Sequence, residues 1–357
     1  MTGVSIILYN PLYIGPHWFK GFEKWLSPQD RMPSKKLKFS SLLVLVVVAI
    51  CFYAWMDDLI NPGSVPHALQ RFKSSNKANE SFTMIMPTFD RTELLFDLLK
   101  HYQAVPYLKQ IIIVWQNIGQ KPPLELWESL GPHLVPILFK EQTQNLLRNR
   151  FLPFPEIDTE AVLTLDDDLQ ISIPDINFAF SVWTQFQDQL VGFVARTHTA
   201  HAKGVYTVST PKTDRYSLAL TGASFFHRRY LKLYHDQDSR LHILVDSIKN
   251  CEDIAMNCVV SFWLLQRYGP DAPPAAVHVK PVDMKWLEMK TKRAKKGRGN
   301  IGLSRRPGFV QQRGYCLTEF VKIWNGTMPL HYNNITLTLT GKKQPQVKMP
   351  NAKKGRK

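Results

Sequence analysis

The chain has 357 residues, with 45 Lys or Arg against 29 Asp or Glu, and a formal charge of +16. Because 44% of its residues are hydrophobic, it has enough apolar surface for a sizeable core, which excludes a disordered tail protein. Four cysteines are too few for a disulfide scaffold, and none are spaced as CxxC, the pattern of structural zinc sites. The length fits one large or two small domains.

The basic charge is concentrated in two segments. Nine Lys or Arg and one Glu lie within 285–306, and seven Lys or Arg without any acidic residue lie within 342–357. Since these bases are not spread over a folded face with interleaved aromatic residues, we expect no nucleic-acid partner. We predict a basic disordered tail at 342–357 and a solvated loop at 285–306, with contact to an anionic acceptor as the alternative for the loop.

An uncharged run at 39–56 is just long enough for a transmembrane helix, which needs about 17–25 residues. Three lysines precede this run and two aspartates follow it. The positive-inside rule therefore predicts a cytoplasmic tail at 1–38, a signal anchor at 39–56 and a lumenal C-terminal part. A cleaved signal peptide is less favoured, because the run begins far from the N-terminus and ends in bulky residues.

Residues 57–80 are polar and interrupted by Pro and Gly, as expected for a stem. The sequons for N-glycosylation begin at Asn79, Asn325 and Asn334, and all follow the predicted anchor. The three cysteines after the anchor allow one disulfide in an oxidising lumen. We therefore expect a single-pass type II protein of the Golgi or endoplasmic reticulum membrane.

From residue 81 the pattern changes to alternating strands and helices, and we expect one domain at 81–341. Apolar runs predict strands at 82–89, 111–117 and 161–169. A helical pattern follows the first strand at 94–103, and an amphipathic stretch lies around 142–150. This alternation predicts an α/β domain with a mostly parallel sheet, whose ligands bind at the carboxyl ends of the strands. The Walker, GxGxxG and GxSxG motifs do not occur at the strand ends.

Three consecutive aspartates, Asp166, Asp167 and Asp168, end the third predicted strand. In extended backbone, Asp166 and Asp168 would share one face and Asp167 would point to the other. Two converging carboxylates repel each other unless a cation lies between them, and a divalent ion shared with substrate phosphates is the usual solution. The alternative is an acidic turn that caps the next helix. The position after a buried strand favours a metal site of the kind found in nucleotide-sugar transferases.

Several segments resemble, in order, the catalytic domain of exostosin-like glycosyltransferases, family 64. They include FTMIMPTFDRTELLFDLLKHYQAVPYL, AVLTLDDDLQIS, TGASFFHRRYL, NCEDIAMN and QQRGYCLTEFVKIWNGTMPLHY. Animal members of this family build heparan sulfate, and plant members glycosylate sphingolipids. The resemblance implies a GT-A nucleotide-sugar-binding fold with a central mixed sheet flanked by helices. It also implies a UDP-sugar donor, Mn²⁺ or another divalent cation, and retention of anomeric configuration.

The resemblance also implies roles for individual residues. Metal ligands would be Asp168 and Asp166. Nucleotide-sugar binding would involve Arg91, Gln116, Asn145, Arg150, Asp166, Asp167 and Asn250. Catalytic residues would be Glu252, Asp253 and Arg313. The implied disulfide joins Cys251 and Cys316. The chain departs from the family at three of its positions, with Pro87 for Gln, Gln116 for Asn and Glu252 for Asp.

We therefore expect a metal-dependent, retaining type II membrane glycosyltransferase that transfers a sugar from a UDP-sugar to a glycan. GlcNAc or GalNAc is the expected sugar, in heparan-sulfate-type or related glycan synthesis. With one catalytic domain, single-sugar transfer is favoured over processive polymerisation. The alternatives are a sphingolipid acceptor, GDP-mannose as donor, or a non-catalytic glycan-binding homologue. Expected partners are the donor, a glycan or glycolipid acceptor, the membrane, and a homodimer mate or other glycosyltransferases.

Overall fold

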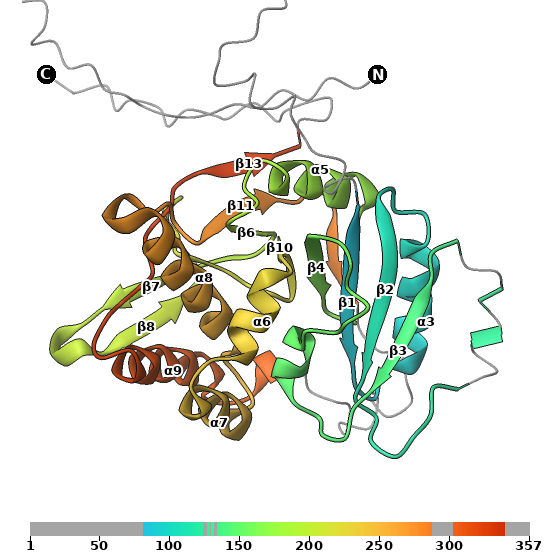
Figure 1. Ribbon diagram of the computed structural model, residues 1–357, viewed down its shortest axis with the longest axis horizontal. Coiled ribbons are helices and arrows are strands. Elements are labelled where there is room, and N and C mark those ends of the chain that lie inside the picture. Colours follow the sequence, from blue (N-terminus) through green and yellow to red (C-terminus); the bar gives the residue numbers. More distant parts are fainter. Residues whose placement is uncertain (1–80, 124–126, 129, 132–133, 288–302, 340–357) are drawn as a thin grey trace, which may run out of the picture. The chain divides into compact units, whose positions relative to one another are not determined.

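The computed structural model describes residues 81–123, 127–128, 130–131, 134–287 and 303–339 (Figure 1). The predicted cytoplasmic tail, anchor and stem lie outside these residues, as do the basic tail and most of the basic segment 285–306. Among the helices of the described part, none is both long and apolar enough to cross a membrane.

A mixed sheet of eight strands, ordered β13-β11-β6-β10-β4-β1-β2-β3, forms the centre of the described part (Figure 1). Seven strands run in one direction, and only β10 (Ala223–His227) is antiparallel to its neighbours. The parallel strands are β1 (Phe82–Thr88), β2 (Leu108–Trp115), β3 (Ile137–Glu141), β4 (Ala161–Leu165), β6 (Leu190–Gly192), β11 (Ala276–Lys280) and β13 (Thr336–Thr338). The prediction of an α/β domain with a mostly parallel sheet is confirmed.

Alternate residues of the central strands face opposite sides of the sheet, as the period of two in a strand requires. Ile85, Val162 and Phe226 belong to one buried apolar cluster. Met84 and Leu163, their neighbours in sequence, belong to a second cluster. Since both faces of the sheet are buried, the central strands are mostly apolar on both faces, which is typical of parallel sheets covered by helices.

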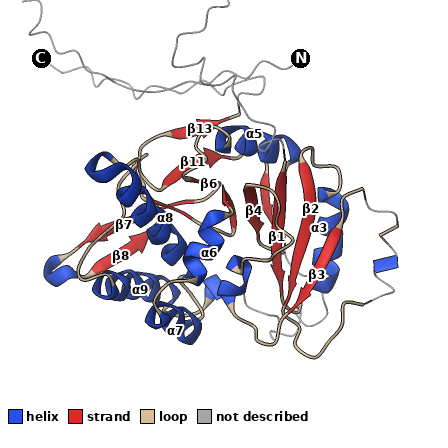
Figure 2. Ribbon diagram, in the orientation of Figure 1, coloured by secondary structure: helices blue, strands red, loops and turns tan. Residues whose placement is uncertain are grey.

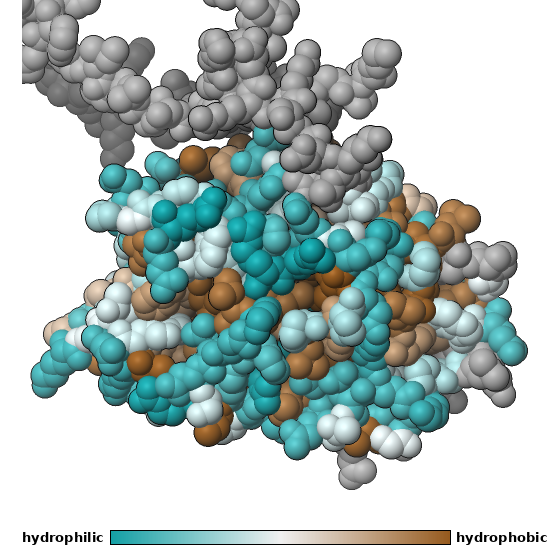
Figure 3. Space-filling view, in the orientation of Figure 1, coloured by the Kyte–Doolittle hydropathy of each residue, from teal (hydrophilic) through white to brown (hydrophobic). Residues whose placement is uncertain are grey.

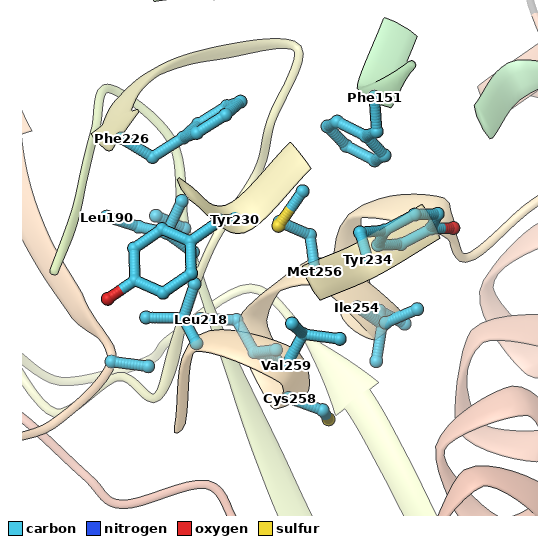
Figure 4. Close-up of a cluster of buried hydrophobic side chains, with 14 of the residues drawn as sticks. Phe151, Leu190, Leu218, Phe226, Tyr230, Tyr234, Ile254, Met256, Cys258 and Val259 are labelled. Atoms are coloured by element: carbon cyan, nitrogen blue, oxygen red, sulfur yellow. The ribbon is translucent and has the colours of Figure 1, made fainter. Parts of the chain in front are cut away.

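Helices cover both faces. The second cluster contains side chains of α3 (Thr92–Tyr102) and α5 (Ile173–Trp183). The first cluster contains side chains of α6 (Arg229–His235), α7 (Ser239–Ile248), α8 (Glu252–Tyr268) and α9 (Phe309–Ile323) (Figure 2). A close-up of the first cluster shows Ile254, Cys258 and Val259 of α8 beside Tyr230 and Tyr234 of α6 (Figure 4). This packing fixes α8 against the sheet.

Two smaller sheets accompany the main one. Strands β8 (Tyr206–Ser209), β7 (Ala195–Ala200) and β9 (Leu218–Ala219) form the first, and β5 (Leu169–Ile171) pairs with β12 (Met284–Trp286) in the second. Hydrophilic side chains cover most of the face in Figure 3, and apolar side chains show through in a band across its middle.

Two local predictions need correction. The strand predicted at 161–169 ends at Leu165, and a turn at 167–168 separates β4 from β5. The apolar residues of β5 made one long strand look continuous. The amphipathic stretch around 142–150 holds only the short 3-10 helix η5 (Leu147–Phe151), which follows β3 after a loop.

Candidate active site

The three aspartates lie directly after β4, at the carboxyl end of the central parallel strands. The backbone N–H of Asp166 donates to the carbonyl of Gly222 over 2.8 Å, which ties the aspartates to the segment before β10. Because Asp167 and Asp168 form a turn, the prediction that Asp167 alone points to the other face is wrong. Asp167 and Asp168 instead share one arginine partner, while Asp166 faces another.

Arg91 is the partner of Asp167 and Asp168. Its Nη1 donates to Asp167 Oδ1 and to Asp168 Oδ2, each over 2.7 Å. The hydroxyl of Thr88, the last residue of β1, donates to Asp167 Oδ2 over 2.7 Å. Arg91 follows Asp90, which has a positive φ of 55° and whose N–H donates to Asn117 Oδ1. The loops after β1 and β2 are thereby joined beside the aspartates.

Burial raises the proton affinity of Asp167 and Asp168. Desolvation, with a smaller contribution from the charge of Asp166, raises the pKa of Asp168 to about 6. Burial also raises the pKa of Asp167, and the nearby Arg91 opposes that shift. Asp166 and Asp168 are thus close enough to repel each other, and additional positive charge at this site would relieve that repulsion.

Arg150, at the end of η5, lies on the other side of Asp166. Its Nη1 donates to Asp166 Oδ1 over 2.8 Å, and its Nε lies 3.9 Å from Glu252 Oε1. Within the described part of the chain this buried Nε has no hydrogen-bond partner. A buried guanidinium N–H without a partner is costly in a finished core, so it is a candidate contact for a bound anion or hydroxyl group.

Glu252 and Asp253 form the first turn of α8, where the helix dipole favours negative charge. Arg313 of α9 donates through Nη2 to Asp253 Oδ2 over 2.8 Å, and both side chains are buried. Burial and the charge of Asp253 raise the pKa of Glu252, while Arg150 opposes the shift. The pair Asp253–Arg313 and the acid Glu252 can therefore stabilise charge or move a proton beside the three aspartates.

A disulfide joins Cys251 and Cys316, with a Cα–Cα distance of 6.4 Å. Cys251 precedes α8 with a positive φ of 77°, and Cys316 lies one helical turn after Arg313 on α9. The bridge therefore links the two segments that carry the Asp253–Arg313 pair. Cys258, in the first core cluster, is a free buried thiol.

Of the residues predicted to bind the donor, Gln116 and Asn250 form hydrogen bonds within the protein, and Asn145 is exposed in a loop. Gln116 is buried, and its Oε1 accepts from the backbone N–H of Leu146 and from Asn149 Nδ2, each over 3.0 Å. Gln116 thus fixes the start of η5, and through it Arg150. Asn250 uses its amide to accept from Arg313 and to donate to the carbonyl of Phe309. Asn145 is exposed in the loop before η5.

Sequence reasoning missed Arg196 of β7. Its guanidinium donates to the carbonyl of Ala195, and the described residues give it no carboxylate within ion-pair distance. Burial and the nearby charge of Arg313 lower its pKa, and the charge of Asp253 opposes the shift. Arg196 therefore lies near the catalytic candidates. An isolated arginine in a short strand has no local sequence signal that would have singled it out.

The aspartates suit a hard divalent cation. In the described part of the chain, no three His, Cys, Asp or Glu side chains lie together as a complete metal cage. Asp166 and Asp168 offer carboxylate oxygens, which Mg²⁺ and Mn²⁺ prefer. A cation held by one or two carboxylates needs further oxygen ligands, and a diphosphate can supply them.

The sequence matches the family model described as "Glycosyl transferase family 64 domain" over residues 82–341. The chain belongs to this family and is a glycosyltransferase. Exostosin-like 2 of Homo sapiens is 43% identical over 315 residues, covering 86% of this chain and 91% of that protein. Exostosin-like 2 of Mus musculus is 42% identical, covering 88% and 94%. Exostosin-2 of Homo sapiens is 34% identical, covering 79% of this chain and 37% of that protein.

Proposed function

We propose that the protein is a metal-dependent, retaining GT-A glycosyltransferase that transfers one sugar from a UDP-sugar to a glycan acceptor. One observation carries the proposal. Arg150 links two charged groups, because it lies between Asp166 and Glu252. The first group is the three aspartates with Arg91, and the second is Glu252 with the buried Asp253–Arg313 pair. N-acetylhexosamine as the sugar, a heparan-sulfate-type acceptor and a lumenal location behind a type II anchor complete the proposal.

The donor would bind across the loops that follow β1 and β4. Guanidinium groups suit phosphate, ribose and base oxygens, because their N–H donors form a planar fork. Arg150 has one such donor free in Nε. The side chain of Arg91 is 20% exposed and is held at the edge of the site by two carboxylates.

Asp168 and Asp166 would hold the divalent cation. Bound there with the donor diphosphate, the cation would neutralise negative charge on the leaving nucleoside diphosphate. Arg91 currently neutralises Asp168, so we expect its guanidinium to share or yield that carboxylate when the cation binds.

The remaining groups would act on the sugar and the acceptor. Arg313 supplies a permanent positive charge that offsets charge on the departing diphosphate. The Asp253 carboxylate, oriented by Arg313, would stabilise positive charge at the anomeric carbon. Glu252, whose pKa burial raises, suits a hydrogen-bond donor or a proton acceptor for the acceptor hydroxyl. Arg196 has no acidic partner in the described residues and would receive an anionic acceptor group such as a uronate.

A second donor has specific support. Pro87 has no side-chain donor, and Gln116 uses its carbonyl oxygen within the protein. Two contacts that could select uracil are therefore altered, and GDP-mannose belongs in any donor panel. A non-catalytic glycan-binding role is less favoured, because the aspartates, Asp253 and Arg313 are all present and arranged together.

The test is turnover of a panel of nucleotide sugars by the full-length protein in detergent, with Mn²⁺ and with EDTA, with and without uronic-acid-containing acceptors. We expect cation-dependent consumption of one UDP-sugar, lost in Asp168→Ala. The anomeric proton coupling of the product, measured by NMR, tests retention. Absence of both turnover and Mn²⁺-dependent nucleotide binding would overturn the proposal and favour the binding-protein alternative.

A further inference from the structure

Asn257 is a fully buried amide in the middle of the apolar face of α8. It has no exposed surface, and Ile254 and Cys258 on either side of it belong to the first core cluster (Figure 4). A buried amide destabilises a core unless its hydrogen bonds are made, and asparagine is a poor helix former. The amide must therefore make hydrogen bonds that an apolar residue could not make.

The amide of Asn257 pairs with one peptide unit of β9. Its Oδ1 accepts from the N–H of Ala219 over 3.0 Å, and its Nδ2 donates to the carbonyl of the same residue over 2.8 Å. Nδ2 also donates to the carbonyl of Asp253 over 2.8 Å. The side chain thus satisfies both backbone groups of Ala219, as a neighbouring strand would.

This contact joins the two halves of the candidate active site. Two residues after Ala219, the carbonyl of Thr221 accepts from Arg150 Nη1, and the next carbonyl, of Gly222, accepts from the N–H of Asp166. On the other side of β9, Leu218 pairs with Arg196 of β7. On α8, Asn257 is bonded to the backbone of Asp253 itself.

We propose that Asn257 is a positioning residue for the transferase reaction, because it holds Asp253 at a fixed place relative to Asp166, Arg150 and Arg196. The predicted effect on kcat rests on the proposed function, whereas the predicted effect on backbone hydrogen exchange does not. Asn257 is buried and contacts the backbone of Ala219 and Asp253, so it acts through these segments and not on substrate.

Ser261 of the same helix provides a matched control. It is also buried, and its hydroxyl also donates to a backbone carbonyl of another segment, that of Pro329. Pro329 lies beyond the end of α9 and is not itself a residue of the candidate active site. Asn257→Leu and Ser261→Ala each remove one buried polar link from α8 to the rest of the core, and both should lower the melting temperature.

The experiment compares these variants in the full-length protein, below their melting temperatures. For Asn257→Leu we expect kcat to fall about tenfold to a hundredfold, with a smaller effect on UDP affinity, because misplacement by about 1 Å has such effects. Ser261→Ala should keep its kcat. In Asn257→Asp, a neutral buried carboxyl can replace both hydrogen bonds to Ala219. This variant should therefore have a higher kcat than Asn257→Leu, and it can be measured even if Asn257→Leu does not fold.

Hydrogen exchange provides a readout independent of catalysis. Amides in 218–222 and at the start of α8 should exchange faster in Asn257→Leu than in Ser261→Ala. Wild-type kcat together with wild-type exchange in Asn257→Leu would overturn the inference. So would an Asn257→Asp variant no more active and no better protected than Asn257→Leu. A wild-type protein without turnover would contradict the proposed function, and hydrogen exchange would still decide the inference.

Discussion

Arg313 of α9 and Asp253 of α8 form a buried ion pair over 2.8 Å, although 60 residues separate them in sequence. A charge buried this deeply is stable only with its partner in place. The pair therefore holds both the geometry and the charge balance of the site.

Removal of the arginine should be severe. We expect Arg313→Ala to lower the free energy of unfolding by about 3–5 kcal/mol, because Asp253 would be left as an unpaired buried charge. Transfer activity should fall with it, even at temperatures where the variant is folded. Chemical denaturation and initial rates measure the two effects. Lys322→Ala, which breaks an exposed pair with Glu319 on the same helix, should change neither quantity. An active Arg313→Ala variant would show that the pair is structural only.

The disulfide beside this pair should stabilise the folded protein. Reduction of Cys251–Cys316 should lower the free energy of unfolding by about 2–4 kcal/mol, the range for a native bridge. Thermal melts with and without dithiothreitol measure this effect. The double variant Cys251→Ala/Cys316→Ala should not respond to the reductant, while Cys258→Ala should respond as the wild type does. A reductant-sensitive double variant would refute the assignment.

Gly222 should be intolerant of a side chain. A Cβ at this position would overlap Asp166 Oδ2, so the carboxylate would have to leave Arg150. Gly222→Ala should therefore weaken Mn²⁺-dependent UDP binding by about tenfold, the loss of roughly one charge-assisted hydrogen bond. Isothermal titration calorimetry measures the affinity. The neighbouring Ser224→Ala removes a hydroxyl without a partner in the described residues and should bind normally. Equal affinity in both variants would contradict the role of Asp166.

Much of the fold followed from sequence, because the strands of a covered parallel sheet are continuous apolar runs. The runs at β1 and β2 were located within a few residues. β3 was missed because its apolar run is only three residues long, from Ile137 to Phe139, and the strand continues into Lys140 and the exposed Glu141. The end of β4 was misplaced because Leu169 and Ile171 of β5 extend the apolar pattern past the aspartates.

The site was harder to derive. Local pattern identified only the three aspartates, and the resemblance supplied the rest. The partners of these residues come from distant segments, such as Arg91 for Asp167, which lies 76 residues later. Gln116 shows that a role implied by the family resemblance cannot always be assigned from the residue type alone. It keeps the amide, yet hydrogen bonds to Leu146 and Asn149 occupy its oxygen.

Buried histidines should make the protein less stable in acid. Burial, with the nearby Arg215, lowers the pKa of His198 to about 4. His198 is buried, its Nδ1 lies 2.8 Å from the Ser217 hydroxyl, and its ring stacks on Tyr332. A histidine whose folded pKa is depressed contributes stability above its unfolded pKa, near 6.5, and that stability is lost as pH falls through the folded value.

Between about pH 6.5 and 4, the effect of His198 should lower the free energy of unfolding by up to about 1.4 kcal/mol for each unit that the pH falls. This is the slope for one extra proton bound on unfolding. Urea denaturation at a series of pH values measures that slope. His198→Gln should be less stable at neutral pH and should have a shallower slope than the wild type in this window. His235→Gln, at an exposed position, is the control and should follow the wild type.

The buried acids Asp168 and Glu252, whose pKa values are raised, act in the opposite direction, since their contribution to stability is lost as pH rises. Only the difference between His198→Gln and the wild type isolates the histidine, and an unchanged slope in that variant would contradict a depressed pKa.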